Sequence, residues 1–77
     1  MGKLILTNDD IVQILANGGG LRIETAGKKT DDLLNFAANA RNGHALLTLV
    51  VNSTLRSQDL ITIAHGRGSV EFILVDD

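Results

Sequence analysis

The chain has 77 residues, a net charge of −2 and no cysteine. This length fits one domain over residues 1–77, and without cysteine there is no disulfide, thiolate chemistry or sulfur-based metal site. Lys and Arg are scattered rather than clustered and only Phe36 and Phe72 are aromatic, so we expect no nucleic-acid partner and an aliphatic core.

The predicted elements alternate between strand and helix. Strands are expected over residues 3–7, 21–25, 45–51 and 70–75, where apolar residues alternate with polar ones. Between them, helices are expected to begin at the capping residues Asn8, Thr30 and Ser57, whose side-chain oxygens can accept an amide of the first turn. Gly18, Gly43 and Gly66 follow, and these residues are expected to end the helices.

The three helices share one pattern. A capping residue and an Asp precede two aliphatic residues, a polar residue, a bulky apolar residue and, further on, a glycine before the next strand. Ile11, Leu33 and Leu60 hold equivalent positions, 22 and 27 residues apart, which is within the range of structural repeats. The pattern also gives each helix an apolar stripe that can cover a sheet. The sequence therefore predicts three repeated helix–strand units after an initial strand.

Strict alternation of this kind predicts an α/β fold, βαβαβαβ, with a four-stranded parallel sheet. Because the strands alternate between apolar and polar residues, we predict two layers, strand order 1-2-3-4 and three helices on one face. The alternative is a flavodoxin-like order 2-1-3-4 with helices on both faces, because the strand over residues 45–51 has apolar residues on both of its sides.

Each face of the predicted sheet has its own composition. The face expected beneath the helices is wholly apolar: Leu4, Leu6, Leu21, Ile23, Ala45, Leu47, Leu49, Val51, Val70, Phe72 and Leu74. The uncovered face mixes apolar and charged residues, and exposed patches of this kind often contact another protein. We predict an interface there, formed by Ile5, Arg22, Glu24, Leu46, Thr48, Val50, Glu71 and Ile73, with Val75 beside them. Pairing of Arg22 with Glu24 or Glu71 of a second copy would suit a two-fold axis.

Aspartates are concentrated at one edge of the predicted sheet, where the strands end and the helices begin. Asp9, Asp10, Asp31 and Asp32 are weak candidates for a hard divalent cation such as Mg²⁺, but acidic residues in a first helical turn are also favoured by the helix dipole alone. We therefore predict no metal and no cofactor. Lys28, Lys29 and Arg56 lie at the same edge, and we expect them to pair with these local aspartates.

Nucleophilic catalysis needs a hydroxyl beside a base. His44 and His65 are predicted at the edge where strands begin, whereas Ser53, Thr54 and Ser57 are predicted at the other edge. A strand separates the two groups by about 20 to 30 Å, so no catalytic pair is expected and the protein is predicted not to be an enzyme.

Two families share limited features with the chain. Residues 3–10, an apolar strand ending in acidic residues, resemble the opening of a response-regulator receiver domain, but the strand over residues 45–51 is followed by Asn52 rather than by an Asp that could be phosphorylated. The alternation of helix and strand resembles leucine-rich-repeat proteins in architecture, without their Leu-x-x-Leu-x-Leu-x-x-Asn pattern.

The sequence thus predicts a non-enzymatic module for protein–protein interaction or self-association, working as a homodimer or with another protein. One alternative is a regulatory or enzymatic domain that binds a metal or an anion at the aspartate-rich edge, and another is a fragment or engineered product without its own function. The chain has no apolar stretch near the about 20 residues that span a bilayer, so we expect a cytoplasmic protein without a membrane partner.

Overall fold

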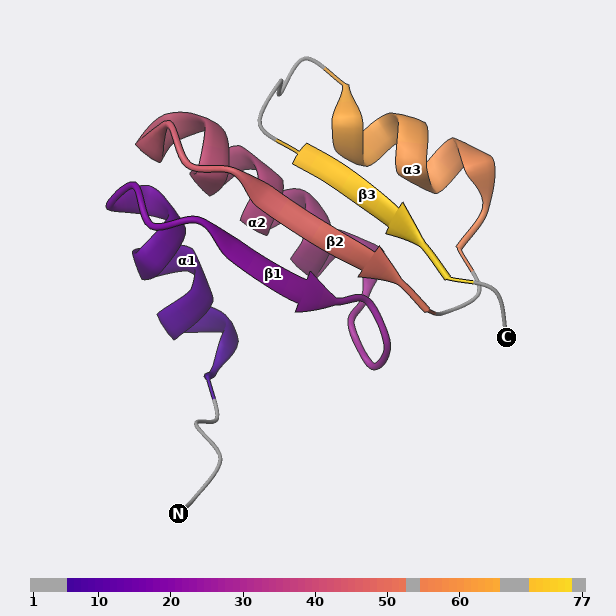
Figure 1. The fold of residues 1–77 in the computed structure, drawn as a ribbon, viewed down its shortest axis with the longest axis horizontal. Coiled ribbons are helices and arrows are strands. Elements are labelled where there is room, and N and C mark those ends of the chain that lie inside the picture. Colours follow the sequence, from indigo (N-terminus) through magenta and orange to yellow (C-terminus); the bar gives the residue numbers. More distant parts are fainter. Residues whose placement is uncertain (1–5, 53–54, 66–69, 76–77) are drawn as a thin grey trace.

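The computed structural model describes residues 6–52, 55–65 and 70–75, which form three helices and three strands in alternation (Figure 1). The elements, in chain order, are α1 (Asn8–Ala16), β1 (Leu21–Glu24), α2 (Thr30–Gly43), β2 (Leu47–Val51), α3 (Ser57–Ala64) and β3 (Val70–Leu74). The predicted α/β class is therefore confirmed.

The strands form one parallel sheet in the order β1-β2-β3. These are the second, third and fourth predicted strands in their predicted order. The flavodoxin-like alternative is wrong, because β1 pairs directly with β2 and leaves no place for a strand between them. The predicted strand over residues 3–7 lies mostly outside the described residues; Leu6 and Thr7, which are described, belong to no strand. A four-stranded sheet stays a prediction.

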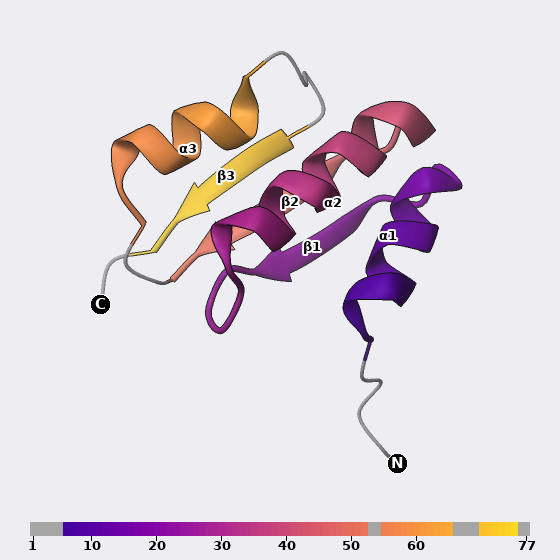
Figure 2. The ribbon, with the colours of Figure 1, turned by 180° about the vertical axis from the view of Figure 1, so that it is seen from behind.

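All three helices lie on the same side of the sheet. The strands stand in front of α2 in Figure 1, and α2 stands in front of them when the molecule is turned by 180° in Figure 2. Burial agrees with this arrangement, since β2 alternates strictly between buried residues and half-exposed ones. The sheet thus has one covered face and one open face.

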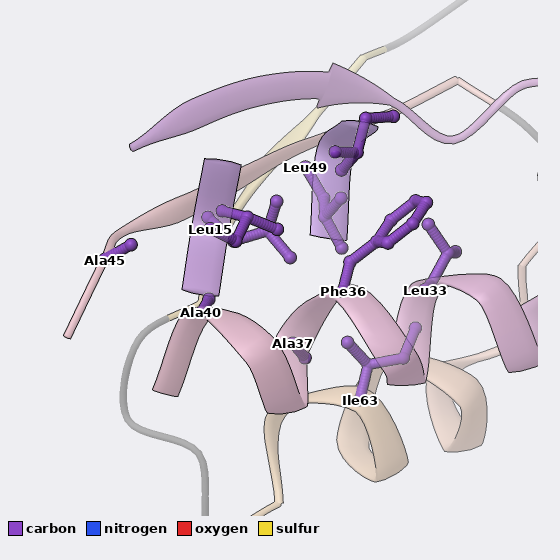
Figure 3. Close-up of a cluster of buried hydrophobic side chains, with 10 residues drawn as sticks. Leu15, Leu33, Phe36, Ala37, Ala40, Ala45, Leu49 and Ile63 are labelled. Carbon is purple, nitrogen blue, oxygen red and sulfur yellow. The ribbon is translucent and has the colours of Figure 1, made fainter. Parts of the chain in front are cut away.

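The core lies between α2 and the sheet (Figure 3). Leu47 and Leu49 of β2 belong to this cluster together with Phe36 and Leu33 of α2, and all four side chains are fully buried. Leu15 of α1 and Ile63 of α3 complete this cluster. At about 2 kcal/mol for each buried large aliphatic side chain, this central cluster is the main source of stability.

One residue of the predicted covered face departs from the expectation. Leu74, at the end of β3, is 70% exposed. It lies on the outer edge strand β3, and the helix before it, α3, contacts α2. Among the described residues no element covers this part of the edge, so the alternation placed Leu74 on the correct side without predicting its exposure.

The helices begin at the predicted residues, but each N-cap lies one residue earlier than predicted, and all three begin in a similar way. The N-caps are Thr7, Lys29 and Arg56 rather than Asn8, Thr30 and Ser57. In each case the carboxylate of an Asp three residues later accepts the backbone N–H of the cap, at 3.1 to 3.3 Å. Only Thr7 completes a capping box, because its hydroxyl also accepts the Asp10 N–H. The Asp residues therefore have a structural role at these helix starts.

At the end of α2, two neighbouring residues have separate roles that the sequence did not predict. The left-handed residue is His44, with φ of 57°, and not Gly43. Gly43 instead allows a close approach of two helix ends, because a Cβ there would overlap the carbonyl oxygen of Leu15 and lie 2.8 Å from the carbonyl carbon of Ala16. The prediction for Gly18 holds, since it follows α1 with φ of 93°, whereas Gly66 lies outside the described residues.

Candidate interaction face

The open face is the side of the sheet that carries no helix. Register places its residues in rows across the three strands: Arg22, Thr48 and Glu71 form one row, and Glu24, Val50 and Ile73 form the next. Each row therefore takes one side chain from every strand, and the charged side chains lie on the outer strands, with Thr48 and Val50 between them.

Apolar residues of this face remain partly accessible. Val50 and Ile73 are half-buried by their neighbours alone, without a covering layer. Leu46, just before β2, is 50% exposed, and Val75, just after β3, is 45% exposed. The open face thus offers a discontinuous apolar surface between exposed charged groups.

The face is hollowed near the carboxyl ends of the strands. An open depression of about 450 Å³ is lined by Arg22, Glu24, Val50, Asn52 and Val75. Two charges of opposite sign, an amide and two valines meet there, so the depression can accept either an apolar side chain or a polar one.

Asn52 connects this depression to the backbone. Its amide nitrogen donates to Glu24 at 2.6 Å, and its amide oxygen accepts the N–H of Ala26 at 3.0 Å. Its own backbone N–H donates at 3.3 Å to the hydroxyl of Thr25, which is fully buried. Asn52 therefore joins the ends of β1 and β2 and holds the Glu24 carboxylate in place.

Asn52 was absent from the predicted interface, although the pattern contained the information to find it. The side-chain period of two that places Thr48 and Val50 on the open face also reaches Asn52, one residue beyond the end of β2. The prediction stopped at the last apolar residue of the strand. The alternation of β2 therefore continues for one residue past the strand and places Asn52 on the open face.

Arg22 and Glu71 differ from Glu24 in their surroundings. Both are exposed, and neither makes a hydrogen bond or ion pair with another residue in the described part of the chain. They stand at opposite ends of the same row, on the two outer strands. The open face therefore carries one positive and one negative group that are both available to a partner.

The structure places the predicted interface residues together where it describes them. Arg22, Glu24, Thr48, Val50, Glu71 and Ile73 share the open face through the register of the strands. Leu46 directly precedes β2 in the same alternation, and Ile5 lies outside the described residues.

Two of the four weak metal candidates accept backbone N–H groups at helix starts. Asp10 and Asp32 accept the backbone N–H groups of Thr7 and Lys29, while Asp9 and Asp31 are exposed in the first turns of α1 and α2. Across the described ranges, no three His, Asp or Glu side chains are grouped so that they could hold a metal ion.

Of the three basic residues at this edge, Lys28 has a partner other than the predicted aspartates. Lys28 donates to the side chain of Asn8 at 2.8 Å and lies 5.8 Å from the centre of the Phe36 ring. The predicted ion pair of Lys28 with an aspartate is therefore wrong: its ammonium group ties the start of α1 to the loop before α2. Lys29 and Arg56 meet their aspartates through backbone N–H groups.

The two histidines lie at helix ends, outside the open face. His44 and His65 are the C-cap residues of α2 and α3, and both are exposed. His44 was predicted at the start of a strand, but β2 begins only at Leu47. Ser53 and Thr54 lie outside the described residues, and Ser57 opens α3 at the far end of that helix from His65.

No family model matches the chain, and neither a curated protein nor a solved structure matches it. Separately, no helix in the described ranges combines the length and the apolar character needed to cross a membrane.

Proposed function

We propose that this chain is a non-enzymatic protein–protein interaction module that binds its partner through the open face of the sheet. The observation that carries the proposal is the one-sided cover: all three helices pack on one face and the apolar residues of the other remain accessible. Half-buried Val50 and Ile73 would become fully buried by a flat partner, and Arg22, Glu24 and Glu71 would surround that contact.

The predicted fourth strand, shortened by Leu6 and Thr7, which belong to no strand, fits this proposal. It would lie beside β1, continue the sheet in the predicted order 1-2-3-4 and add Ile5 to the open face. The interface would then extend over the outer side of Arg22 and Glu24.

Site-specific photo-crosslinking tests the proposal. A benzophenone amino acid replaces Val50, at the centre of the open face, and in a matched control it replaces Ile61, which is 59% exposed on α3. We expect the Val50 position to form a covalent adduct with a protein chain in cells that express the module, whether that chain is a copy or a different protein. We expect the Ile61 position to form none.

A second substitution shows whether the adduct depends on the face itself. Ile73→Lys places a charge beside Val50 in the same row, so it should abolish the Val50 adduct while circular dichroism shows an intact fold. The absence of any adduct at Val50, or equal adducts at Val50 and Ile61, would contradict an interface on the open face.

A further inference from the structure

We propose that the occupant of the open face is a second copy of the chain, related by a two-fold axis parallel to β2. Arg22 of each copy then meets Glu71 of the partner subunit. This inference rests on the proposed function and adds to it the identity of the partner and the geometry of pairing.

The first step is the order of charges along a row. Register sets Arg22, Thr48 and Glu71 side by side on β1, β2 and β3. Crossing the sheet along this row, a positive group comes first, a small uncharged one second and a negative group third. The row is therefore charged oppositely at its two ends.

The second step is what a two-fold rotation does to this row. Rotation about an axis that runs along the strands, midway between two stacked sheets, keeps the position along the strand and reverses the strand order. It brings β1 over the partner's β3 and β2 over the partner's β2. Because Arg22 and Glu71 share a row, each then faces its opposite charge, and two such pairs form by symmetry.

The third step is the fit of side-chain lengths. Stacked sheets lie about 10 Å apart. Arg and Glu are long enough together to span that gap at the outer strands, and the short side chains of Thr48 and Val50 meet their own copies in the middle. The partly buried Val50 would lose its remaining contact with water against its own copy, and Ile73 would lie opposite Glu24 of the partner subunit.

A second axis, perpendicular to the strands, competes with the first. It would place Arg22 opposite Glu24 of the partner subunit and Glu71 opposite the partner's Ile73. The strand-parallel axis places Glu24 opposite the partner's Ile73, so the two axes do not differ in setting one carboxylate against Ile73. However, Glu24 already accepts a 2.6 Å hydrogen bond from Asn52, whereas Glu71 has no such bond within the described residues. The strand-parallel axis pairs the two available charges and is therefore favoured.

Three short strands form a small surface, below the about 800 Å² that each partner contributes to a standard interface. We therefore expect a reversible dimer with a dissociation constant in the micromolar range or weaker. Its association should weaken at high salt, because the Arg22 and Glu71 pairs lie at the rim where ions screen them.

The test is a charge exchange followed by analytical ultracentrifugation at protein concentrations up to about 1 mM. Arg22→Glu and Glu71→Arg alone should each lower the association constant at least about tenfold, since each places two like-charged pairs across the axis. An equimolar mixture of the two variants, one carrying a fluorescent label, should form heterodimers with wild-type affinity. The double variant R22E/E71R should also dimerise.

The mixture separates the specific pairs from overall charge. R22E changes the net charge from −2 to −4 and E71R changes it from −2 to 0. General repulsion would therefore make E71R associate more strongly than the wild type, in contrast to the expected loss. Circular dichroism of each variant should show the wild-type fold, because both side chains are exposed.

A monomeric wild type at about 1 mM, or a mixture that stays monomeric while the wild type dimerises, would overturn the self-pairing. An unchanged association of E71R would do the same and would indicate the perpendicular axis. If the Val50 crosslink captures a different protein and the wild type is monomeric, self-pairing is wrong and the interaction module stands. If Val50 captures nothing, both proposals are contradicted.

Discussion

The two ends of the sheet differ in how firmly a helix holds them. At the β1 end, α1 buries Ile11 and Leu15, and its last turn meets the last turn of α2 so closely that Gly43 has no room for a Cβ. At the β3 end, Ile63 is the buried residue of α3. Ile61 and Leu74 there are 59% and 70% exposed.

This difference shows that similar helix patterns can contribute unequally to one fold. The central helix α2 has a helix on either side and buries four residues, Leu33, Phe36, Ala37 and Ala40. The outer helices each have α2 on one side, and α1 makes the closer approach to it. We infer that stability is concentrated in α1, α2 and β2, and that α3 and β3 open first.

The largest expected effect is at the contact between α1 and α2. Gly43→Ala should lower the free energy of unfolding by about 3 kcal/mol or more, because backbone atoms of Leu15 and Ala16 must move to admit the methyl group. Urea denaturation measures the change. The control is Gly27→Ala, where a Cβ meets open space but φ is 77°; it should cost about 1–2 kcal/mol. Equal losses in the two variants would argue against the close approach.

The next effect in size is the difference in stability between alanine variants at two isoleucines of α3, Ile63 and Ile61. Ile63→Ala removes a fully buried side chain and should cost about 2–4 kcal/mol, whereas Ile61→Ala, at a largely exposed position, should change stability by less than about 0.5 kcal/mol. Thermal unfolding of both variants checks this. Hydrogen exchange should also show faster exchange in α3 and β3 than in α2. Comparable protection of all three elements would contradict the proposed difference between the ends.

The smallest effect concerns the start of α3. The side chain of its cap, Arg56, accepts no hydrogen bond from an amide of the first turn. At the start of α1, by contrast, the Thr7 hydroxyl accepts the N–H of Asp10. Arg56→Ser would supply the missing hydroxyl and complete a capping box with Asp59, so we expect a gain of about 0.5–1 kcal/mol. Arg56→Ala, as the matched control, should give no gain. Chemical denaturation resolves the two, and an equal response would exclude capping as the cause.

Much of the architecture followed from local patterns. The period of two in residues 45–51 predicted the buried and half-exposed sides of β2, and the capping residues Asn8, Thr30 and Ser57 marked where the helices begin. These features depend on neighbours in the chain, so sequence spacing alone can predict them.

Other features depend on contacts between distant residues and were missed for that reason. The role of Gly43 arises from Leu15 and Ala16 of another helix, and Lys28 turns from the nearby aspartates to Asn8 and Phe36. Asn52 joins the open face by bonding Glu24, which precedes it by 28 residues. For the candidate site, alternation identified the members of the open face, but not the hydrogen bond that separates Glu24 from Glu71.

By itself the sequence determined the class of fold, the parallel direction of the strands and the two unlike faces of the sheet, because side-chain periodicity and capping are local properties. Tertiary structure decided which strands are neighbours, on which side all three helices lie and which charges remain without a partner among the described residues. Those outcomes depend on how whole elements pack, since burial of Leu15, Phe36 and Ile63 in one cluster can be satisfied only after the chain has folded back on itself.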